Sequence, residues 1–234
     1  MKRALTLALV CSLAMGATPA PTLEGASGLA LCQLSLDGVV GERPHPWVSI
    51  SVTHRVEEEL VETSLIGQFK PGTTGASLAT LLAKRLKEQG ARVTESTALD
   101  MTADLFIEDV TSVRVDLPAG PGASVTFCDR PLGVLSLRPT SPTPGAGRLE
   151  FRGVVSDVSG RHRSMESLEI PVIEGESGHE VCKRLFDRSL EAGWLPVREK
   201  TDRWSPSRRT DSRKLLSSEV KLSASGWELE LRAG

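Results

Sequence analysis

The sequence predicts an α+β fold built from two tandem strand-rich repeats, each an antiparallel sheet with one packed helix. A complete helix with start and stop signals occupies residues 71–90, and a second one aligns with it without a gap at residues 174–193. Segments of alternating apolar and polar residues surround both helices. Two unrelated helices that share common capping chemistry are the alternative interpretation. The alignment matches Gly72 with Gly175, Thr74 with Ser177, Gly75 with Gly178, and Gly90 with Gly193.

The first helix is predicted over residues 74–90. Thr74 is a favourable N-cap, because its hydroxyl accepts a hydrogen bond from a free N–H group of the first turn. Gly90 suits the left-handed conformation that ends many helices. In the second helix, Ser177 and Glu180 form the sequence pattern of a capping box. The apolar stripes have i, i+4 spacing and comprise Leu78, Leu82 and Leu86 in the first helix, and Val181, Leu185, Phe186 and Leu190 in the second.

Strands are predicted where apolar residues alternate with polar ones. The clearest is residues 47–56, in which aliphatic residues alternate with serine and threonine. Residues 105–115 form a second clear strand, which we expect to break near Asp109, and residues 97–103 are predicted as a loop. The other predicted strands are residues 29–36, 60–69 and 91–95 in the first repeat, and 125–128, 133–137, 149–155, 164–173, 194–197, 218–222 and 227–231 in the second. The sequence leaves open whether the repeats pack helix to helix or join their sheets edge to edge.

The N-terminus has the pattern of a secretory signal peptide over residues 1–16. Lys2 and Arg3 precede an apolar run, and small residues stand at the two positions that a signal peptidase reads. The chain is therefore expected to be exported, to the periplasm or the medium. The remaining predicted boundaries are a flexible leader at 17–28, a first repeat at 29–117, a linker at 118–123, and a second repeat at 124–234 with a basic insertion at about 198–217.

Composition narrows the class of partner. The net charge is −2, so there is no overall field that would gather nucleic acid. After the signal peptide no apolar run approaches the ~20 residues of a membrane-spanning helix, so no transmembrane segment is expected in the mature chain. The order of helix, glycine, short strand and a further strand beginning near residue 103 resembles that of many small bacterial envelope domains. This resemblance concerns architecture and implies no functional residue.

Patterns that carry catalysis or bind cofactors are absent from the sequence. The glycine-rich segment at residues 71–75 lacks the lysine of a phosphate-binding loop. No histidine or cysteine pair has the spacing of a local zinc site. We therefore predict no catalytic residue, no metal and no cofactor. The first residues to test for a site assembled from distant parts of the chain are His54, His179, Asp100 and Asp104.

Three cysteines remain after removal of the signal peptide, in an oxidising compartment. An odd number leaves at least one thiol free or paired between chains. Cys182 is interpreted as a small core residue of the second helix. If a disulfide forms, Cys32 and Cys128 are the expected pair.

The basic insertion is the predicted recognition surface. Its candidate partner-binding residues are Arg203, Trp204, Arg208, Arg209, Arg213 and Lys214. They would suit an acidic protein, a phosphorylated glycan or an anionic lipid headgroup, and a solvated loop is the alternative.

The function favoured by the sequence is that of a non-catalytic binding or structural protein of the bacterial cell envelope, with another envelope or extracellular protein as its partner. The alternatives are a secreted hydrolase with a site between the repeats, or a secreted inhibitor.

Overall fold

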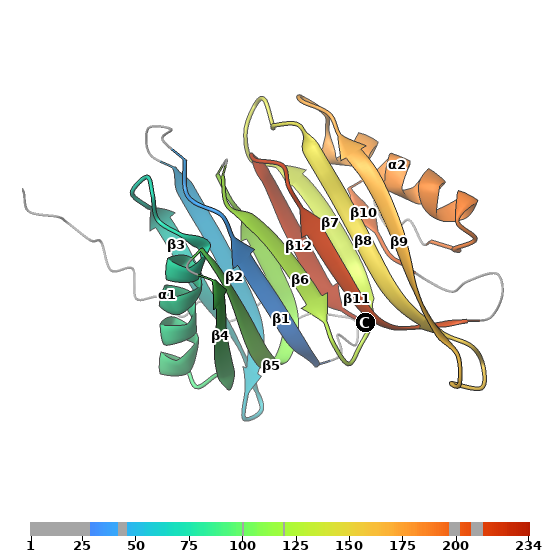
Figure 1. The fold of residues 1–234 in the computed structure, drawn as a ribbon, viewed down its shortest axis with the longest axis horizontal. Helices are drawn as coiled ribbons and strands as arrows, with labels where there is room; N and C mark the ends of the chain where they lie inside the picture. Colours follow the sequence, from blue (N-terminus) through green and yellow to red (C-terminus); the bar gives the residue numbers. More distant parts are fainter. Residues whose placement is uncertain (1–28, 42–45, 100, 119, 197–201, 207–212) are drawn as a thin grey trace, which may run out of the picture.

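The computed structural model describes residues 29–41, 46–99, 101–118, 120–196, 202–206 and 213–234. Within them the protein is mostly β, with two helices and one large antiparallel sheet that curls into a half-barrel (Figure 1). The predicted signal peptide and leader lie outside these residues. The strands are β1 (Ala30–Asp37), β2 (Trp47–Val56), β3 (Glu59–Gln68), β4 (Val93–Leu99), β5 (Thr102–Asp116), β6 (Gly122–Phe127), β7 (Leu132–Pro139), β8 (Gly147–Ser156), β9 (Arg163–Val172), β10 (Arg203–Trp204), β11 (Lys214–Leu222) and β12 (Trp227–Ala233).

One sheet, rather than the predicted two, contains all twelve strands. Its main path is β10-β7-β12-β5-β1-β6-β11-β8-β9. The two halves of the chain are joined directly, because β1 pairs with β6 and β5 pairs with β12. The strands of the second half form two groups, β10-β7-β12 and β6-β11-β8-β9, which are separated by β5 and β1 of the first half, so the sheet is neither of the two arrangements that the sequence left open. The predicted division into two separate sheets is wrong, since the apolar faces of both halves line one continuous core.

Strand β5 is the point at which the sheet forks. Its first part pairs with β4 and β1, and its second part, Val110 to Asp116, pairs with β2 and β12. Between the two parts Asp109 has a φ of 56°, which is unusual for a residue with a side chain. The register of β1 and of β2 against β5 also shifts here, so the strand contains a bulge. The predicted break near Asp109 is confirmed.

The helices α1 (Gly75–Glu88) and α2 (Gly178–Glu191) begin and end close to the predicted positions. The Thr74 side chain accepts a hydrogen bond from the Ser77 N–H, and Ser177 and Glu180 form the predicted capping box. α1 packs on β1, β3, β4 and β5, whereas α2 packs on β7, β9 and β10. The helices therefore lie at opposite ends of the sheet (Figure 1).

The two ends of the strand path meet through side chains. The ring of Phe151 on β8 lies 5.0 Å from that of Trp204 on β10 and 5.8 Å from that of Trp194, edge to face in both cases. α2 packs over this junction, on β10 and β9. Aromatic side chains and α2 therefore pack β8 and β9 against β10, between which no backbone hydrogen bonds form among the described residues.

Several local predictions need correction. Of the predicted strand at 194–197, only Trp194 forms a single β-bridge, residues 195 and 196 are not in a strand, and residue 197 lies outside the described residues. β6 begins at Gly122, inside the predicted linker, and β4 extends to Leu99, inside a predicted loop. The predicted basic insertion at about 198–217 contains β10 and the start of β11.

Candidate functional site

The predicted partner-binding residues do not form one surface. Trp204 is a buried core residue, whose indole N–H donates to the Ser189 hydroxyl at 3.1 Å. It is therefore not available to a partner. Arg203 points to the opposite face of the sheet, because neighbouring residues of a strand alternate. Arg208 and Arg209 lie outside the described residues.

Arg213 and Lys214 lie beside the turn that joins β8 to β9. Lys214 is the register partner of Ser156, which is the partner of Arg163, so Lys214 and Arg163 share one face of the sheet. Arg161, in the turn, is a third exposed cation. We call this region the basic end and define it by Arg161, Arg163, Arg213, Lys214 and the exposed apolar residues Val158 and Met165. In Figure 1 it is the end of the β8–β9 hairpin, next to the start of β11.

Asp157 gives the β8–β9 turn its shape. Its carboxylate accepts hydrogen bonds from the N–H groups of Arg161 and His162 and from the Ser159 hydroxyl. These hydrogen bonds, that from Ser159 first, hold the pKa of Asp157 below its usual range. Gly160 supplies the left-handed residue of the turn, with a φ of 73°. The acid therefore faces into the turn, while the arginines on either side of His162 remain exposed.

A second surface runs across six strands on the face of the sheet that points away from the core. We call it the polar face. Its central row consists of successive register partners on β3, β2, β5, β12, β7 and β10: Ser64, Ser51, Arg114, Glu230, Ser136 and Arg203. At about 4.8 Å between neighbouring strands, this row is roughly 24 Å long. Ser51, Ser136 and Glu230 of this row are buried and the other three side chains are half-buried, so the row itself has little contact with water.

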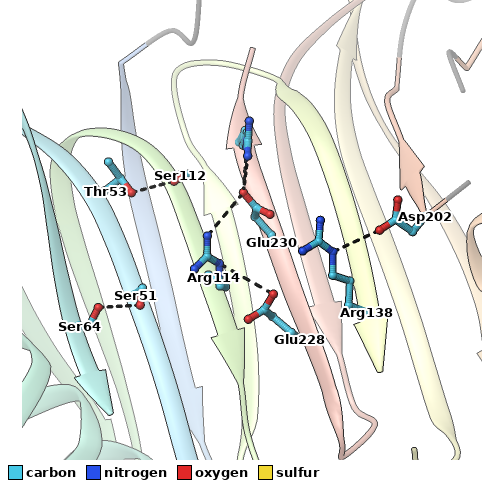
Figure 2. Close-up of polar contacts among 10 residues, drawn as sticks. Ser51, Thr53, Ser64, Ser112, Arg114, Arg138, Asp202, Glu228 and Glu230 are labelled. Carbon is cyan, nitrogen blue, oxygen red and sulfur yellow. Dashed lines mark hydrogen bonds and ion pairs between the residues drawn. The ribbon is translucent and has the colours of Figure 1, made fainter. Parts of the chain in front are cut away.

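The charges of the polar face are paired across strands, as Figure 2 shows. The guanidinium of Arg114 lies 3.9 Å from the Glu228 carboxylate and 4.0 Å from that of Glu230. Arg232 donates to Glu230 at 2.7 and 2.9 Å, and Arg138 donates to Asp202 at 3.2 Å. The hydroxyls on β2, β3 and β5 form their own short hydrogen bonds, Ser51 with Ser64 and Ser112 with Thr53. The face is therefore close to neutral, with both signs interspersed.

Three polar groups of this face are poorly satisfied, among them the buried Nε of Arg114, which has no hydrogen-bond partner among the described residues. The Ser136 hydroxyl is buried and has no hydrogen-bond partner among the described residues. Asp116, one row away from Arg114, has its pKa raised to about 6, chiefly by burial and further by the charge of Glu228; a hydrogen bond from Thr140 acts in the opposite direction. The ionised form of Asp116 is thus poorly stabilised in the native protein.

A small apolar corner completes the polar face. Trp47 and Ile66 are 51% and 49% exposed, and they occupy diagonal positions on β2 and β3, where large side chains can reach each other. Trp194, Trp204 and Trp227 are all buried. Trp47 is therefore the one tryptophan presented to solvent, and it lies next to the rows of polar side chains. The sequence indicated its strand but gave no reason to prefer it over the other tryptophans.

A charged depression of about 390 Å³ lies beside the bulge of β5. Arg92 donates to Asp109 and forms an ion pair with Glu108, both at 2.8 Å, and Arg55 lies 3.9 Å from Asp109. The depression is lined by Arg55, Val56, Glu57, Gly90, Arg92, Glu108 and Asp109. Because its acids are already paired with its arginines, we interpret this cluster as holding together the ends of β2, α1 and β5.

The residues proposed for an assembled catalytic site are not brought together. His54 is buried on β2 with its Nε2 3.0 Å from the Thr63 hydroxyl, and burial lowers its pKa. His179 is an exposed residue of α2, and the two helices lie at opposite ends of the sheet. Asp104 lies on β5, and Asp100 is outside the described residues. No group of three or more His, Cys, Asp or Glu among the described residues could hold a metal ion.

Cys32, Cys128 and Cys182 are free thiols in the structure. Cys32 is buried and its register partner is Phe127, whereas Cys128 is exposed and its N–H donates to Leu31. Cys128 follows the last residue of β6, directly after Phe127. Burial raises the pKa of the Cys128 thiol. A Cys32–Cys128 disulfide therefore stays a prediction, which thiol counting tests below.

The fold and these surfaces define the chain as a mostly β protein with a curled sheet and two helices. Comparison of the chain with protein-family models, curated proteins and solved structures finds no match in any of the three. Neither helix of the described region has the length and apolar character needed to span a membrane.

Proposed function

We propose that this chain is an exported, non-catalytic binding protein of the bacterial cell envelope, and that it binds another protein through the polar face. The exposure of Trp47, beside Ile66 and the charged rows, supports this proposal most directly. Tryptophan and arginine are enriched among the residues that dominate protein–protein affinity. Export rests on the signal-peptide pattern of residues 1–16.

The charge pattern of the polar face favours a protein as the partner. Its arginines are matched by acids, so it lacks the positive field that binds nucleic acid or an anionic membrane. A folded protein can offer an apolar pocket for the indole of Trp47 and, beside it, hydrogen-bonding groups of both signs. An apolar anchor beside a polar surface is common in protein interfaces, which combine apolar and polar contacts.

The proposal is tested by crosslinking followed by affinity measurement. Ile66 is replaced by the photoreactive p-benzoylphenylalanine in the producing cells, and the crosslinked partner is identified and purified. We expect Trp47→Ala to raise the Kd for that partner by about 30-fold, the equivalent of ~2 kcal/mol at a hot spot. Met101→Ala removes another half-exposed apolar side chain, in the turn between β4 and β5, and is expected to leave the Kd unchanged. A Kd for Trp47→Ala within twofold of the wild-type value, with the fold intact by circular dichroism, would contradict the proposal.

We also infer that the two halves arose by duplication of one unit. Each half has a hairpin followed by a 14-residue helix and a left-handed glycine, Gly90 or Gly193. The glycine that begins each helix lies against a strand carbonyl oxygen, that of Leu36 for Gly75 and that of Leu137 for Gly178. These corresponding close approaches support the gapless alignment of the helices.

A further inference from the structure

We propose that the basic end is a membrane-contact site, which binds the surface of an anionic phospholipid bilayer independently of the protein partner of the polar face. The basic end combines two properties that are typical of segments that bind anionic bilayers: cations that are free of ion pairs, and exposed apolar side chains at the tip of a projecting hairpin. The polar face also exposes apolar side chains, Trp47 and Ile66, but its arginines Arg114, Arg138 and Arg232 are paired with acids.

Three of the four cations of the basic end are available to an anion, whereas Arg213 forms an ion pair with Glu166 at 2.9 Å. Within the described part of the chain, Arg161, Arg163 and Lys214 are exposed and have no carboxylate within ion-pair distance. Two acids lie close to them in the β8–β9 hairpin: Asp157 is occupied by hydrogen bonds inside the turn, and Glu166 is paired with Arg213. These three cations can therefore approach lipid phosphates without first breaking an ion pair. Positive residues close to an anionic membrane surface contribute about 1 kcal/mol each.

The apolar residues lie at the same end. Val158 is 75% exposed in the turn, and Met165 is 72% exposed two residues after Arg163, on the same face of β9. Side chains of this kind lose little by entering the headgroup region, whereas they are unfavourable in water. Because side chains two residues apart on a strand share one face, Arg163 and Met165 place a cation and an apolar group side by side on the same surface.

An anionic bilayer fits this arrangement better than an acidic protein. The site is a narrow hairpin end rather than a broad surface, and a protein interface usually buries about 800 Å² on each side. A bilayer needs only a few cations and a shallow apolar insertion, and it accepts them without a complementary shape. The acids Glu166 and Asp157 beside the site are paired with Arg213 and with groups of the turn, which reduces their repulsion of lipid phosphates.

The test measures binding of the exported, processed protein to vesicles of phosphatidylglycerol and phosphatidylcholine by sedimentation. We expect binding to phosphatidylglycerol vesicles, weak binding to pure phosphatidylcholine, and loss of binding as salt is raised, because salt screens the cations. The triple change Arg161→Glu, Arg163→Glu and Lys214→Glu should weaken binding on the order of 100-fold. Val158→Asp should weaken it by about tenfold through the apolar contact.

The matched control changes the same charge elsewhere. Lys70→Glu, Lys87→Glu and Arg130→Glu alter three exposed cations outside the basic end and should leave vesicle binding within threefold of wild type. Equal losses in the two triple variants would show a mere effect of net charge and would overturn the proposal. So would equal binding to both lipids. A p-benzoylphenylalanine at residue 158 that crosslinks in cells to a protein rather than to lipid would assign the site to that protein instead.

Discussion

Replacement of Asp116 by asparagine should stabilise the protein above pH 6. Burial and the neighbouring Glu228 raise the pKa of this carboxyl from 3.8 to about 6 in the folded chain. The folded protein therefore holds the proton more tightly than the unfolded chain does. The stabilising contribution of the neutral carboxyl is fully present below pH 3.8 and is lost as the pH rises through 6. Asparagine keeps a neutral side chain of the same shape at every pH.

The magnitude follows from the size of the shift. A difference of two pKa units corresponds to about 3 kcal/mol, and partial exposure of the side chain reduces this to about 1–2 kcal/mol. For a chain of this size that stabilisation corresponds to a rise of roughly 2–8 °C in the melting temperature. The amide oxygen can still accept the Thr140 hydrogen bond, so we expect no offsetting loss there.

The assay is urea unfolding of wild type and Asp116→Asn at intervals from pH 3 to pH 8. The difference in free energy of unfolding between the two should be near zero at pH 3, grow between pH 4 and pH 6, and stay constant above pH 6.5. Glu58→Gln changes an exposed acid in the β2–β3 turn and should show almost no such growth. Parallel curves for wild type and Asp116→Asn over the whole range would refute the reasoning.

Two further predictions concern backbone contact and thiols. Gly178→Ala should lower the free energy of unfolding by about 3 kcal/mol or more, because a Cβ there would lie 2.0 Å from the Leu137 carbonyl oxygen. The control Gly67→Ala meets only an ordinary contact and should lower the free energy of unfolding by less than about 1 kcal/mol. Equal losses in the two variants, measured by thermal unfolding, would contradict the packing of α2 described above. A thiol reagent should label Cys128 in the native processed protein and three cysteines after unfolding; a single labelled cysteine after unfolding would instead show the Cys32–Cys128 disulfide.

The strands and helices were largely predictable because their signals are local. β2 coincides with the predicted residues 47–56, since a strand with one buried face has an alternating sequence. Both helices carry their caps within the sequence. The bulge at Asp109 was also predicted from a polar interruption of an apolar alternation. Each of these features depends on residues that are neighbours in the chain.

The order of the strands was not predictable from local pattern. β1 pairs with β6, and β5 with β12, across separations of about ninety and one hundred and twenty residues. Alternation shows that a strand has a buried face, but it does not identify the strand beside it. The burial of Trp204 was missed for the same reason: its neighbours in sequence are charged, while the residues that enclose it, such as Phe151 and Ser189, come from β8 and α2.

The residues of the candidate surfaces were likewise predictable only where their signal is local in the sequence. Arg213 and Lys214 were predicted as recognition residues from a local excess of positive charge. Their neighbours Arg161 and Arg163 were not, because a turn fifty residues earlier becomes adjacent only when β11 pairs with β8. The polar face depends wholly on register, since its central row takes one residue from each of six strands.

The continuity of the sheet has a consequence for both proposed surfaces. The polar face and the basic end belong to strands of one hydrogen-bonded network, which runs from β2 through β5, β1, β6 and β11 to β8. A loop between independent domains would let the two surfaces reorient, whereas a sheet with a single core holds them at a fixed separation and angle. A bilayer bound at the hairpin end of β8 and β9 would thus fix the direction in which Trp47 faces. The protein that binds the polar face would then find it in one orientation relative to the membrane. This fixed orientation lowers the entropic cost of binding between the two proteins.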